Sequence, residues 1–453
     1  MKKISFILFL ITRCFYPLVA QTWLPMDKGI NCFYTGDVKK IVVDSVNDQL
    51  FICGSFGQEG NCNSLLGTAK WNGMHFEAIG ALKGTPMKYG MGLYNDTLYA
   101  SGIFYDSTIS IYYAKWNGSY WDTLPKGPSE VVFTSLQKEN VLYIGGGFDH
   151  IADDSTFLLG KYDGHQFSAI TPYYGPQGGY SVNSLVYFQD TLYVGGRFSM
   201  WPYHNYDTFA KWYGNDLHPT ASEFINSVGT SNIYSMAVYH NELYIAGYFR
   251  KVDGYTGNYI MKWDGHQLTE VGTGTDDLVT CMKVYNDALY IGGYFTHAGG
   301  ILSNHVAKWN GTNWISVTTD TFTGSYPLIS DIGVYRDSLI IAGNFVAING
   351  DSTVNCVAKY SVPLTGIDES PLDNKVSVYP NPSSNQITLE FSEATTQTTI
   401  LQIKNTLGQI IKKIPLARGN KQLEIDISDL APGFYFVQMQ SGNRMISKKF
   451  IKQ

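Results

Sequence analysis

One phrase recurs seven times along this chain. In its clearest form it reads LYIGGYF at Leu289–Phe295 and then, after a gap, VAKWNG at Val306–Gly311. A Gly-x-Phe element closes the first half of each copy, and successive copies lie 44 to 51 residues apart. The seven phenylalanines are Phe56, Phe104, Phe148, Phe198, Phe249, Phe295 and Phe345. A period this regular predicts seven copies of one structural unit.

Each unit contains four segments with the composition of β-strands. In the fifth unit these are residues 233–239, 243–249, 259–263 and 267–271, which alternate or are rich in β-branched and aromatic side chains. Units of about 50 residues with four strands are typical of β-propeller blades. We therefore predict an all-β fold in which residues 21–360 form a seven-bladed β-propeller.

Two short turns and two longer loops connect these segments. Asn-Gly or Asp-Gly joins the third strand to the fourth, and pairs such as Asn286-Asp287 join the first to the second. We expect both kinds to be two-residue turns with positive φ at both central residues. In an antiparallel meander these turns share one end of the sheet, here named the turn face. The long, variable loops share the opposite end, the loop face, where we expect binding residues to lie.

Glycine pairs interrupt the second strand of several units, as at Gly145-Gly146, Gly195-Gly196 and Gly292-Gly293. Glycine weakens a strand unless another backbone approaches closely. Convergence of neighbouring blades would supply that approach. We predict that these glycines face the next blade.

The seventh unit lacks its fourth strand, because it ends at Tyr360 without an Asn-Gly turn. An unassigned segment with the right pattern, Thr22–Pro25, lies at the other end of the chain and resembles residues 313–316. We predict that this N-terminal strand completes the seventh blade. Closing the ring in this way removes exposed sheet edges.

Residues 1–20 have the features of a secretory signal peptide. Lys2 and Lys3 precede the apolar run at residues 4–11, and cleavage is expected after Ala20. No other segment approaches the roughly 20 apolar residues that span a bilayer. The mature chain keeps five cysteines, so at least one thiol is unpaired. We therefore expect an exported protein with no transmembrane segment.

The repeat pattern LY-x-GG-x-F…A-K-W-N-G…W resembles the propeller repeats of the fungal cortical-marker family and of many bacterial surface proteins. It is more distantly similar to kelch-type units. The resemblance covers residues 21–360. It implies the fold but no activity, because proteins with such repeats share no single function.

Residues 361–375 form a polar linker, and residues 376–453 form a separate module with alternating strands that suit a small immunoglobulin-like β-sandwich. Its strings VSVYPNP, NTLGQ, LAPGFY and KKFIK closely resemble the type A sorting domain of the type IX secretion system. The motif residues are Tyr379, Pro380, Asn381, Pro382, Gly408, Gly433, Tyr435 and Lys449.

The resemblance implies the type IX secretion machinery as a partner and passage through the outer membrane of a Gram-negative bacterium. It also implies removal of the domain near the linker and attachment to surface lipopolysaccharide. The expected location is secreted or on the outer-membrane surface. A generic immunoglobulin-like appendage is the alternative.

Catalytic and metal-binding motifs do not emerge from the sequence. It has no His-Glu-x-x-His, no Gly-x-Ser-x-Gly and no Gly-rich phosphate loop after a strand. The acidic loop residues Asp153, Asp154, Asp253 and Asp351 lack the alternating ladder of a calcium loop. The formal charge of -6 argues against a nucleic-acid partner. We predict no catalytic residue, metal or cofactor.

Tryptophan usage identifies one sector of the loop face. Eight of nine tryptophans occupy repeat positions, and only Trp201 does not. It lies in the fourth unit between the second and third strands, near tyrosines of this loop and of the preceding inter-blade loop. The candidate ligand-binding residues are Trp201, Tyr203, Tyr206, Tyr173, Tyr174 and Tyr180. Clustered aromatic rings suit sugars or peptides, although they also pack loops against each other.

These observations favour an exported, non-enzymatic propeller that binds a glycan or a protein. A polysaccharide hydrolase or lyase, with paired carboxylates at the axis of the loop face, is the alternative. A mainly structural surface protein without a small ligand is a third hypothesis.

Overall fold

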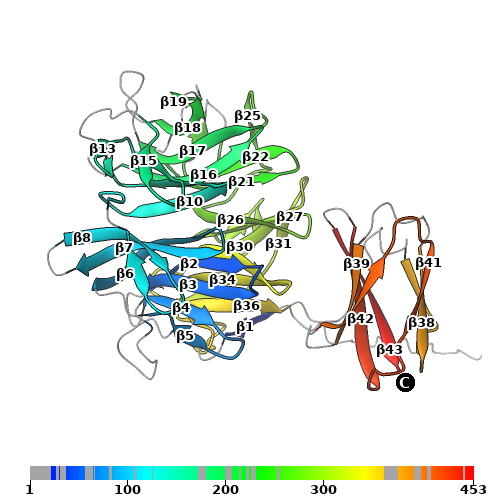
Figure 1. The fold of residues 1–453 in the computed structure, drawn as a ribbon. Helices are drawn as coiled ribbons and strands as arrows, with labels where there is room; N and C mark the ends of the chain where they lie inside the picture. Colours follow the sequence, from blue (N-terminus) through cyan, green and yellow to red (C-terminus); the bar gives the residue numbers. More distant parts are fainter. Residues whose placement is uncertain are drawn as a thin grey trace, which may run out of the picture.

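The computed structural model describes residues 22–26, 30, 37–56, 65, 67–80, 84–106, 109–124, 126–171, 180–198, 207–213, 216–220, 224–225, 231–252, 256–361, 376–391, 399–405, 410–441 and 444–453. Every regular element in these residues is a β-strand, as the predicted all-β class requires (Figure 1). In this described part, no helix has the length and apolarity needed to cross a bilayer. The predicted signal peptide and linker residues 362–375 lie outside it.

Seven four-stranded antiparallel sheets occupy residues 22–361. The first contains β2 (Asp37–Asp44), β3 (Gln49–Ser55), β4 (Thr68–Trp71) and β5 (Phe76–Ala78). The second contains β6 (Gly84–Tyr94), β7 (Thr97–Asp106), β8 (Ile109–Trp116) and β9 (Trp121–Thr123). The third contains β10 (Val132–Lys138), β11 (Val141–Gly146), β14 (Leu159–Tyr162) and β15 (Phe167–Ala169). The fourth contains β16 (Ser181–Phe188), β17 (Thr191–Phe198), β18 (Asp207–Tyr213) and β19 (Asp216–Pro219).

The remaining three sheets follow the same order. The fifth contains β21 (Asn232–Tyr239), β22 (Glu242–Tyr248), β24 (Ile260–Trp263) and β25 (Leu268–Glu270). The sixth contains β26 (Val279–Tyr285), β27 (Ala288–Gly293), β30 (Val306–Trp309) and β31 (Trp314–Ser316). The seventh contains β33 (Leu328–Tyr335), β34 (Ser338–Asn344), β36 (Val357–Ser361) and β1 (Thr22–Pro25).

The predicted pairing of the N-terminal strand is confirmed. β1 pairs antiparallel with β36, and Trp23 lies opposite Tyr360. The Trp23 side chain is buried against Phe322 and Tyr360. The seventh sheet is therefore assembled from both ends of the repeat region.

Neighbouring sheets meet through their first strands. β2 contacts β6, β6 contacts β10, and the series continues through β16, β21, β26 and β33. β33 in turn contacts β2, so the series returns to its start. Figure 1 shows the sheets following one another in chain order.

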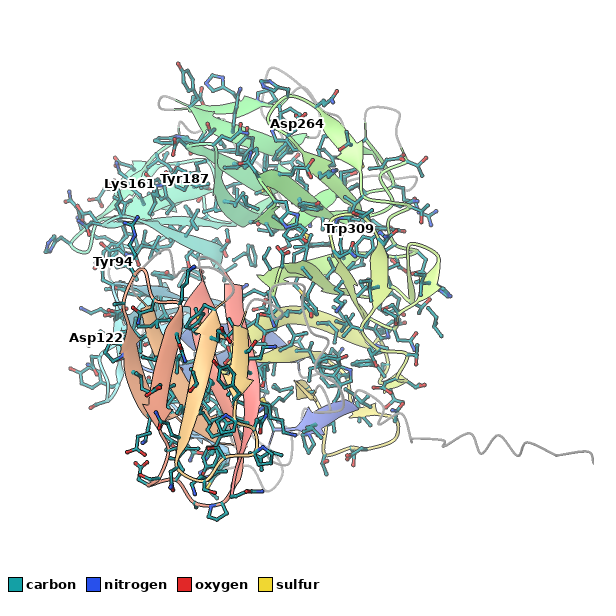
Figure 2. The ribbon with its side chains drawn as sticks, turned by 90° about the vertical axis from the view of Figure 1, so that its right-hand side faces the viewer. Tyr94, Asp122, Lys161, Tyr187, Asp264 and Trp309 are labelled. Carbon is teal, nitrogen blue, oxygen red and sulfur yellow. The ribbon has the colours of Figure 1, made fainter. Side chains whose placement is uncertain are left out.

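One hydrogen bond recurs between neighbouring sheets on the turn face. Tyr94, labelled in Figure 2, donates its hydroxyl to the carbonyl oxygen of Asn140 in the next sheet, at 2.7 Å. Tyr239 and Tyr285 make the equivalent bonds to Asp287 and Asp337. Tyr335 of the seventh sheet donates to Asp48 of the first, at 3.2 Å. The seventh and first sheets thus contact each other as consecutive sheets do.

The predicted two-residue turns are confirmed between first and second strands in five sheets. Both central residues have positive φ in Asn95-Asp96, Gln189-Asp190, His240-Asn241, Asn286-Asp287 and Arg336-Asp337. The first sheet differs, because its turn spans four residues, 45–48, between the paired Asp44 and Gln49. Asp44 accepts the N–H groups of Val46 and Asn47 and stabilises this longer turn.

The two-residue prediction is wrong for the turns between third and fourth strands. Trp309 pairs with Trp314, so this turn has four residues, and only Gly311 has positive φ. Asn310 Oδ1 accepts the N–H groups of Thr312 and Asn313, at 3.0 and 2.8 Å. The side chain thereby favours a wider turn, and the same bonds occur at Asn72, Asn117, Asp163 and Asp264.

Close approach explains the strand glycines, in two different ways. A Cβ at Gly195 would lie 2.6 Å from Ile233 Cγ2, and one at Gly292 would lie 2.7 Å from Ile329 Cγ2, both in the next sheet. For the first glycine of each pair the neighbouring sheet does come close, but through a side chain and not through its backbone as predicted. The second, such as Gly293, instead faces the carbonyl of Leu278 in its own sheet, beside a β-bulge.

Four short two-stranded sheets add structure to the loop face, where only loops were expected. Two are hairpins: β12 (His150–Ile151) with β13 (Asp154–Ser155), and β28 (His297–Ala298) with β29 (Ile301–Leu302). The other two join an inter-sheet loop to the next long loop: β20 (Phe224–Ile225) with β23 (Lys251–Val252), and β32 (Phe322–Thr323) with β35 (Ala347–Ile348).

The C-terminal module has two sheets and its own apolar core. One sheet contains β37 (Val376–Tyr379), β38 (Gln386–Phe391) and β41 (Gln422–Asp426). The other has the order β40 (Ile410–Leu416), β39 (Thr399–Asn405), β42 (Gly433–Ser441) and β43 (Arg444–Lys452). Leu389, Ile403 and Phe450 are among the core side chains. The module agrees with the predicted small antiparallel β structure.

Candidate functional site

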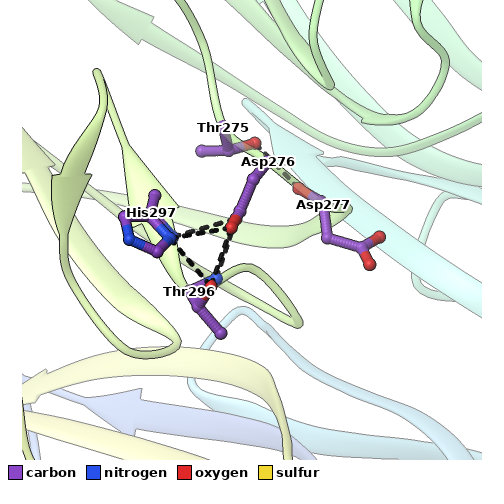
Figure 3. Close-up of polar contacts among 5 residues, drawn as sticks. All are labelled: Thr275, Asp276, Asp277, Thr296 and His297. Atoms are coloured by element: carbon purple, nitrogen blue, oxygen red, sulfur yellow. Dashed lines mark hydrogen bonds and ion pairs between the residues drawn. The ribbon is translucent and has the colours of Figure 1, made fainter.

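A polar cluster on the loop face joins the loop before β26 to the hairpin β28–β29 (Figure 3). Asp276 Oδ1 accepts the N–H groups of Thr296 and His297, at 2.8 and 2.9 Å. Its Oδ2 lies 2.7 Å from Thr296 Oγ1 and 3.0 Å from His297 Nδ1. One carboxylate therefore holds both the backbone and the side chains at the start of the hairpin.

Asp276 favours its charged form in this cluster. Partial burial opposes ionisation, but the hydrogen bonds from His297 and Thr296 outweigh it and hold the Asp276 pKa below its ordinary value. The His297 and Asp276 side chains remain 47% and 41% exposed. A carboxylate beside Nδ1 can orient an imidazole for proton transfer. With four donors already bound to Asp276, we assign its first role to holding the loop.

The third sheet has a related cluster in which hydroxyl and acid are exchanged, because Ser129 Oγ on the loop accepts the N–H groups of Asp149 and His150. Ser129 Oγ donates to Asp149 Oδ1 at 3.0 Å, and Asp149 Oδ1 lies 2.8 Å from His150 Nδ1. The hydrogen bond to His150 is the main reason why the Asp149 pKa is lowered. Neither cluster was predicted from the sequence. A histidine two positions after the Gly-x-Phe phenylalanine, as in FDHIA and FTHAG, is the signal that could have found them.

A charged pair links the first strands of the seventh and first sheets. Asp331 Oδ2 lies 3.3 Å from Lys40 Nζ and accepts the Ile41 N–H at 2.8 Å. Asp331 Oδ1 accepts the N–H of Ile332 at 3.0 Å. The Asp331 carboxylate raises the Lys40 pKa, and this attraction outweighs the opposing effect of burial. The pair holds the two sheets together.

Two buried thiols lie within electrostatic range of Lys40. Cys281 and Cys53 are both buried and reduced, and burial raises the pKa of the Cys281 thiol. Cys356 is disulfide-bonded, with its partner outside the described residues. A high thiol pKa disfavours the reactive thiolate, so Cys281 suits packing rather than nucleophilic chemistry.

Lys40 also borders a cavity of about 120 Å³. Its walls come from β6, at Gly90 and Met91, from β10, at Thr134 and Ser135, and from Tyr113. A space of this size can hold a few ordered water molecules.

The predicted aromatic sector lies mostly outside the described residues. This applies to Trp201, Tyr203, Tyr206, Tyr173 and Tyr174. Tyr180 is described. It is half-buried and packs against an apolar cluster that contains Val182 and Phe198. Tyr180 thus contributes to packing, and the sector as a binding site remains a prediction.

The eight repeat-position tryptophans contribute to packing. Trp23, Trp121, Trp263, Trp309 and Trp314 are buried, and Trp71, Trp116 and Trp212 are half-buried. The indole N–H of Trp121 donates to the Ile79 carbonyl of the preceding sheet at 2.7 Å. Trp212 and Trp314 make equivalent bonds to Ile170 and Val271. In the seventh sheet the Tyr360 hydroxyl makes this bond instead, to Val317 at 3.0 Å.

Within the residues that the structure describes, no group of three or more His, Cys, Asp or Glu side chains is arranged to hold a metal ion. The candidate sorting residues are described except for Gly408. Tyr435 is buried and stacks on Phe450, with ring centroids 5.6 Å apart. Residues 379–382 are exposed and lie along the last strand, β43.

Comparison with known families identifies the C-terminal module. Residues 377–453 match the family model of the secretion system C-terminal sorting domain. No curated protein matches the chain. The sorting domain marks the protein as a substrate of type IX secretion, located at the cell surface or outside the cell, and implies interaction with the type IX machinery.

Proposed function

We propose that residues 21–360 form a seven-bladed β-propeller with cortical-marker and kelch-like repeats, closed by its N-terminal strand. The cyclic series of contacts between first strands supports this arrangement. The hydrogen bond from Tyr335 to Asp48, which repeats the contact between consecutive sheets, supports it further. The pairing of β1 with β36 supplies the missing fourth strand of the seventh blade.

We infer that this propeller is an exported, non-enzymatic binding module for a glycan or a protein. The observation that carries the inference is the difference between the two ends of the sheets. The turn face is closed by short turns capped by their own side chains. The loop face carries longer loops held by added sheets and by the Asp276 and Asp149 clusters. Such loops on a rigid scaffold suit recognition.

The proposed ligand contacts are the aromatic side chains of the fourth blade and its neighbouring loop. They are Trp201, Tyr203, Tyr206, Tyr173, Tyr174 and Tyr180. Flat rings with polar edges suit pyranose rings and extended peptides. Because the sorting domain takes the chain out of the cell, the expected ligands are extracellular glycans or surface proteins.

A glycan and peptide array with the mature chain tests this function. We expect binding to a defined ligand class and loss of at least tenfold in affinity in Trp201→Ala, because truncating a central aromatic contact costs about 2 kcal/mol or more. Absence of binding by a correctly folded chain would contradict the proposal.

The enzymatic alternative needs a proton-donating carboxyl group beside a second acid. Two described acids on the first strands are each paired with a lysine. Asp37 Oδ2 lies 2.5 Å from Lys39 Nζ, and Asp331 Oδ2 lies 3.3 Å from Lys40 Nζ. Both carboxylates are thus engaged in ion pairs, and Asp331 also accepts the N–H groups of Ile41 and Ile332. We therefore favour binding. Release of reducing ends from polysaccharides by the mature chain would support the enzyme instead.

A further inference from the structure

The two ends of the sorting domain are joined by hydrogen bonds. β43 is an edge strand of its sheet, so its outer backbone groups need partners. Asn381 Nδ2 donates to the carbonyl oxygen of Lys449 at 3.1 Å, and Asn381 Oδ1 accepts the N–H of Ile451 at 2.9 Å. The side-chain amide therefore replaces a neighbouring strand at this point.

Ser383 continues the pairing with its backbone. Its N–H donates to the carbonyl oxygen of Ile451, and its carbonyl oxygen accepts the N–H of Gln453, both at 2.9 Å. We name Asn381 and Ser383, together with residues 449–453, the terminal clamp. It brings the first motif of the domain, YPNP, against the last, KKFIK.

The motif residues differ in what they contribute to the fold. Tyr435 is buried against Phe450 and donates its hydroxyl to the Ala431 carbonyl at 2.9 Å, so the core accounts for it. Tyr379 is 42% exposed, and Pro380, Pro382 and Lys449 are exposed as well. Core packing accounts for none of these four exposed residues.

We propose that Tyr379, Pro380, Pro382 and Lys449 form one composite surface that the type IX machinery recognises, and that Asn381 positions its two halves. This inference rests on the sorting role of the domain and assigns recognition by the type IX machinery to four of its residues. We name these four residues the motif surface. Tyr435 serves the fold of the domain.

The chemistry of the motif surface defines what it fits. Two prolines hold the backbone extended and offer rigid apolar rings, and Tyr379 adds an aromatic face with a polar tip. Lys449, whose carbonyl oxygen accepts the Asn381 amide, adds a positive charge on the adjoining strand. A complementary partner has an apolar or aromatic groove for the Tyr-Pro segment and a carboxylate for the lysine.

Export of the full-length chain in a bacterium with a type IX system tests the proposal. The measured quantity is the ratio of chain on the surface and in the medium to chain held in the periplasm. The test variant is Tyr379→Ser with Lys449→Gln. The matched control is Ile410→Ser with Lys413→Gln, which changes an exposed apolar residue and an exposed lysine on β40, the opposite edge strand.

We expect export to fall at least tenfold in the test variant and to stay within twofold of wild type in the control. The unfolding midpoint of the sorting domain, measured on the purified full chain, should be unchanged in both. Export of the wild-type chain tests the type IX sorting role separately from the motif surface. Unchanged export of the test variant would overturn the proposal, as would a loss that accompanies unfolding of the domain.

Asn381→Ala tests the positioning role separately. We expect faster amide exchange at Ile451 and reduced export, while Tyr379 and Lys449 are intact. Asn381→Asp keeps the acceptor for Ile451 but loses the donor to Lys449, so its export should be intermediate. Normal export of Asn381→Ala despite fast exchange at Ile451 would exclude a positioning role.

Discussion

At the scale of single residues, the pair of Lys40 and Asp331 distinguishes the contact between the seventh and first sheets. Asp331 binds one ammonium and two backbone N–H groups, whereas Lys40 is 43% exposed and has Asp331 as its ion-pair partner. Substitution of Asp331 and substitution of Lys40 therefore leave different groups of the fold without a partner. Loss of Asp331 leaves a buried N–H without an acceptor, which is the more costly defect.

Asp331→Ala should lower the free energy of unfolding by about 3 kcal/mol. Lys40→Met should lower it by only about 1 kcal/mol, because the Lys40 side chain is 43% exposed and two backbone N–H groups still stabilise the Asp331 carboxylate. Urea denaturation of both variants and of the double variant measures the two effects and their coupling. Equal losses in the two single variants would contradict this assignment.

The Asp276 cluster predicts that the stability of the fold depends on pH. The pKa of the Asp276 carboxyl group is lower in the folded chain than its ordinary value of 3.8, so the carboxylate stabilises the fold above that pH. This contribution is lost as the pH falls through the folded-state pKa. Asp276→Asn should flatten the decline of the unfolding midpoint below pH 4. The same decline in wild type and variant would show that Asp276 does not contribute to acid sensitivity.

At the scale of elements, the sequence could predict the strands better than the turns. The expected strands of the fifth unit agree with β21, β22, β24 and β25 to within two residues at each end. Composition carries that information, because β22 is a run of mostly apolar side chains whose five central residues are all buried. The turn at residues 310–313 was mispredicted because an Asn-Gly pair fits both a two-residue turn and a four-residue turn capped by the asparagine side chain.

Asn310→Ala tests the cap of that turn. It removes the acceptor of the Thr312 and Asn313 N–H groups, so the free energy of unfolding should fall by about 1 kcal/mol. Thr312→Ala is a suitable control, because the N–H of residue 312 is retained. Thermal unfolding of both variants is the measurement, and equal stability of Asn310→Ala and wild type would refute the role of the cap.

The loop-face hairpins could not be predicted from periodicity, since two-residue strands such as β28 and β29 are too short to show it. Their stability comes from tertiary contacts, above all from Asp276, which lies 20 residues before Thr296 in the chain. For the same reason the sequence could identify an aromatic sector around Trp201 without defining its geometry. Residue types can be read from the sequence directly, whereas the geometry of a site depends on loops that connect different sheets.

At the scale of the whole molecule, the seventh sheet depends on the N-terminal strand for its fourth member. Trp23 is the buried anchor of β1, between Phe322 and Tyr360. Trp23→Ala should lower the free energy of unfolding by about 3–5 kcal/mol. Urea denaturation checks the loss, with exposed Leu24→Ala in the same strand as control. Similar effects of the two substitutions would contradict an anchoring role for Trp23.

Recognition through the loop face is the central claim, and calorimetric titration of the strongest array ligand tests it most directly. The two proteins to compare are Trp201→Ala and Tyr120→Ala. Tyr120 is an aromatic residue, 62% exposed, in a turn on the opposite face. We predict at least a tenfold loss of affinity in Trp201→Ala and an unchanged dissociation constant in Tyr120→Ala. Full affinity in Trp201→Ala, or an equal loss in Tyr120→Ala, would contradict the account.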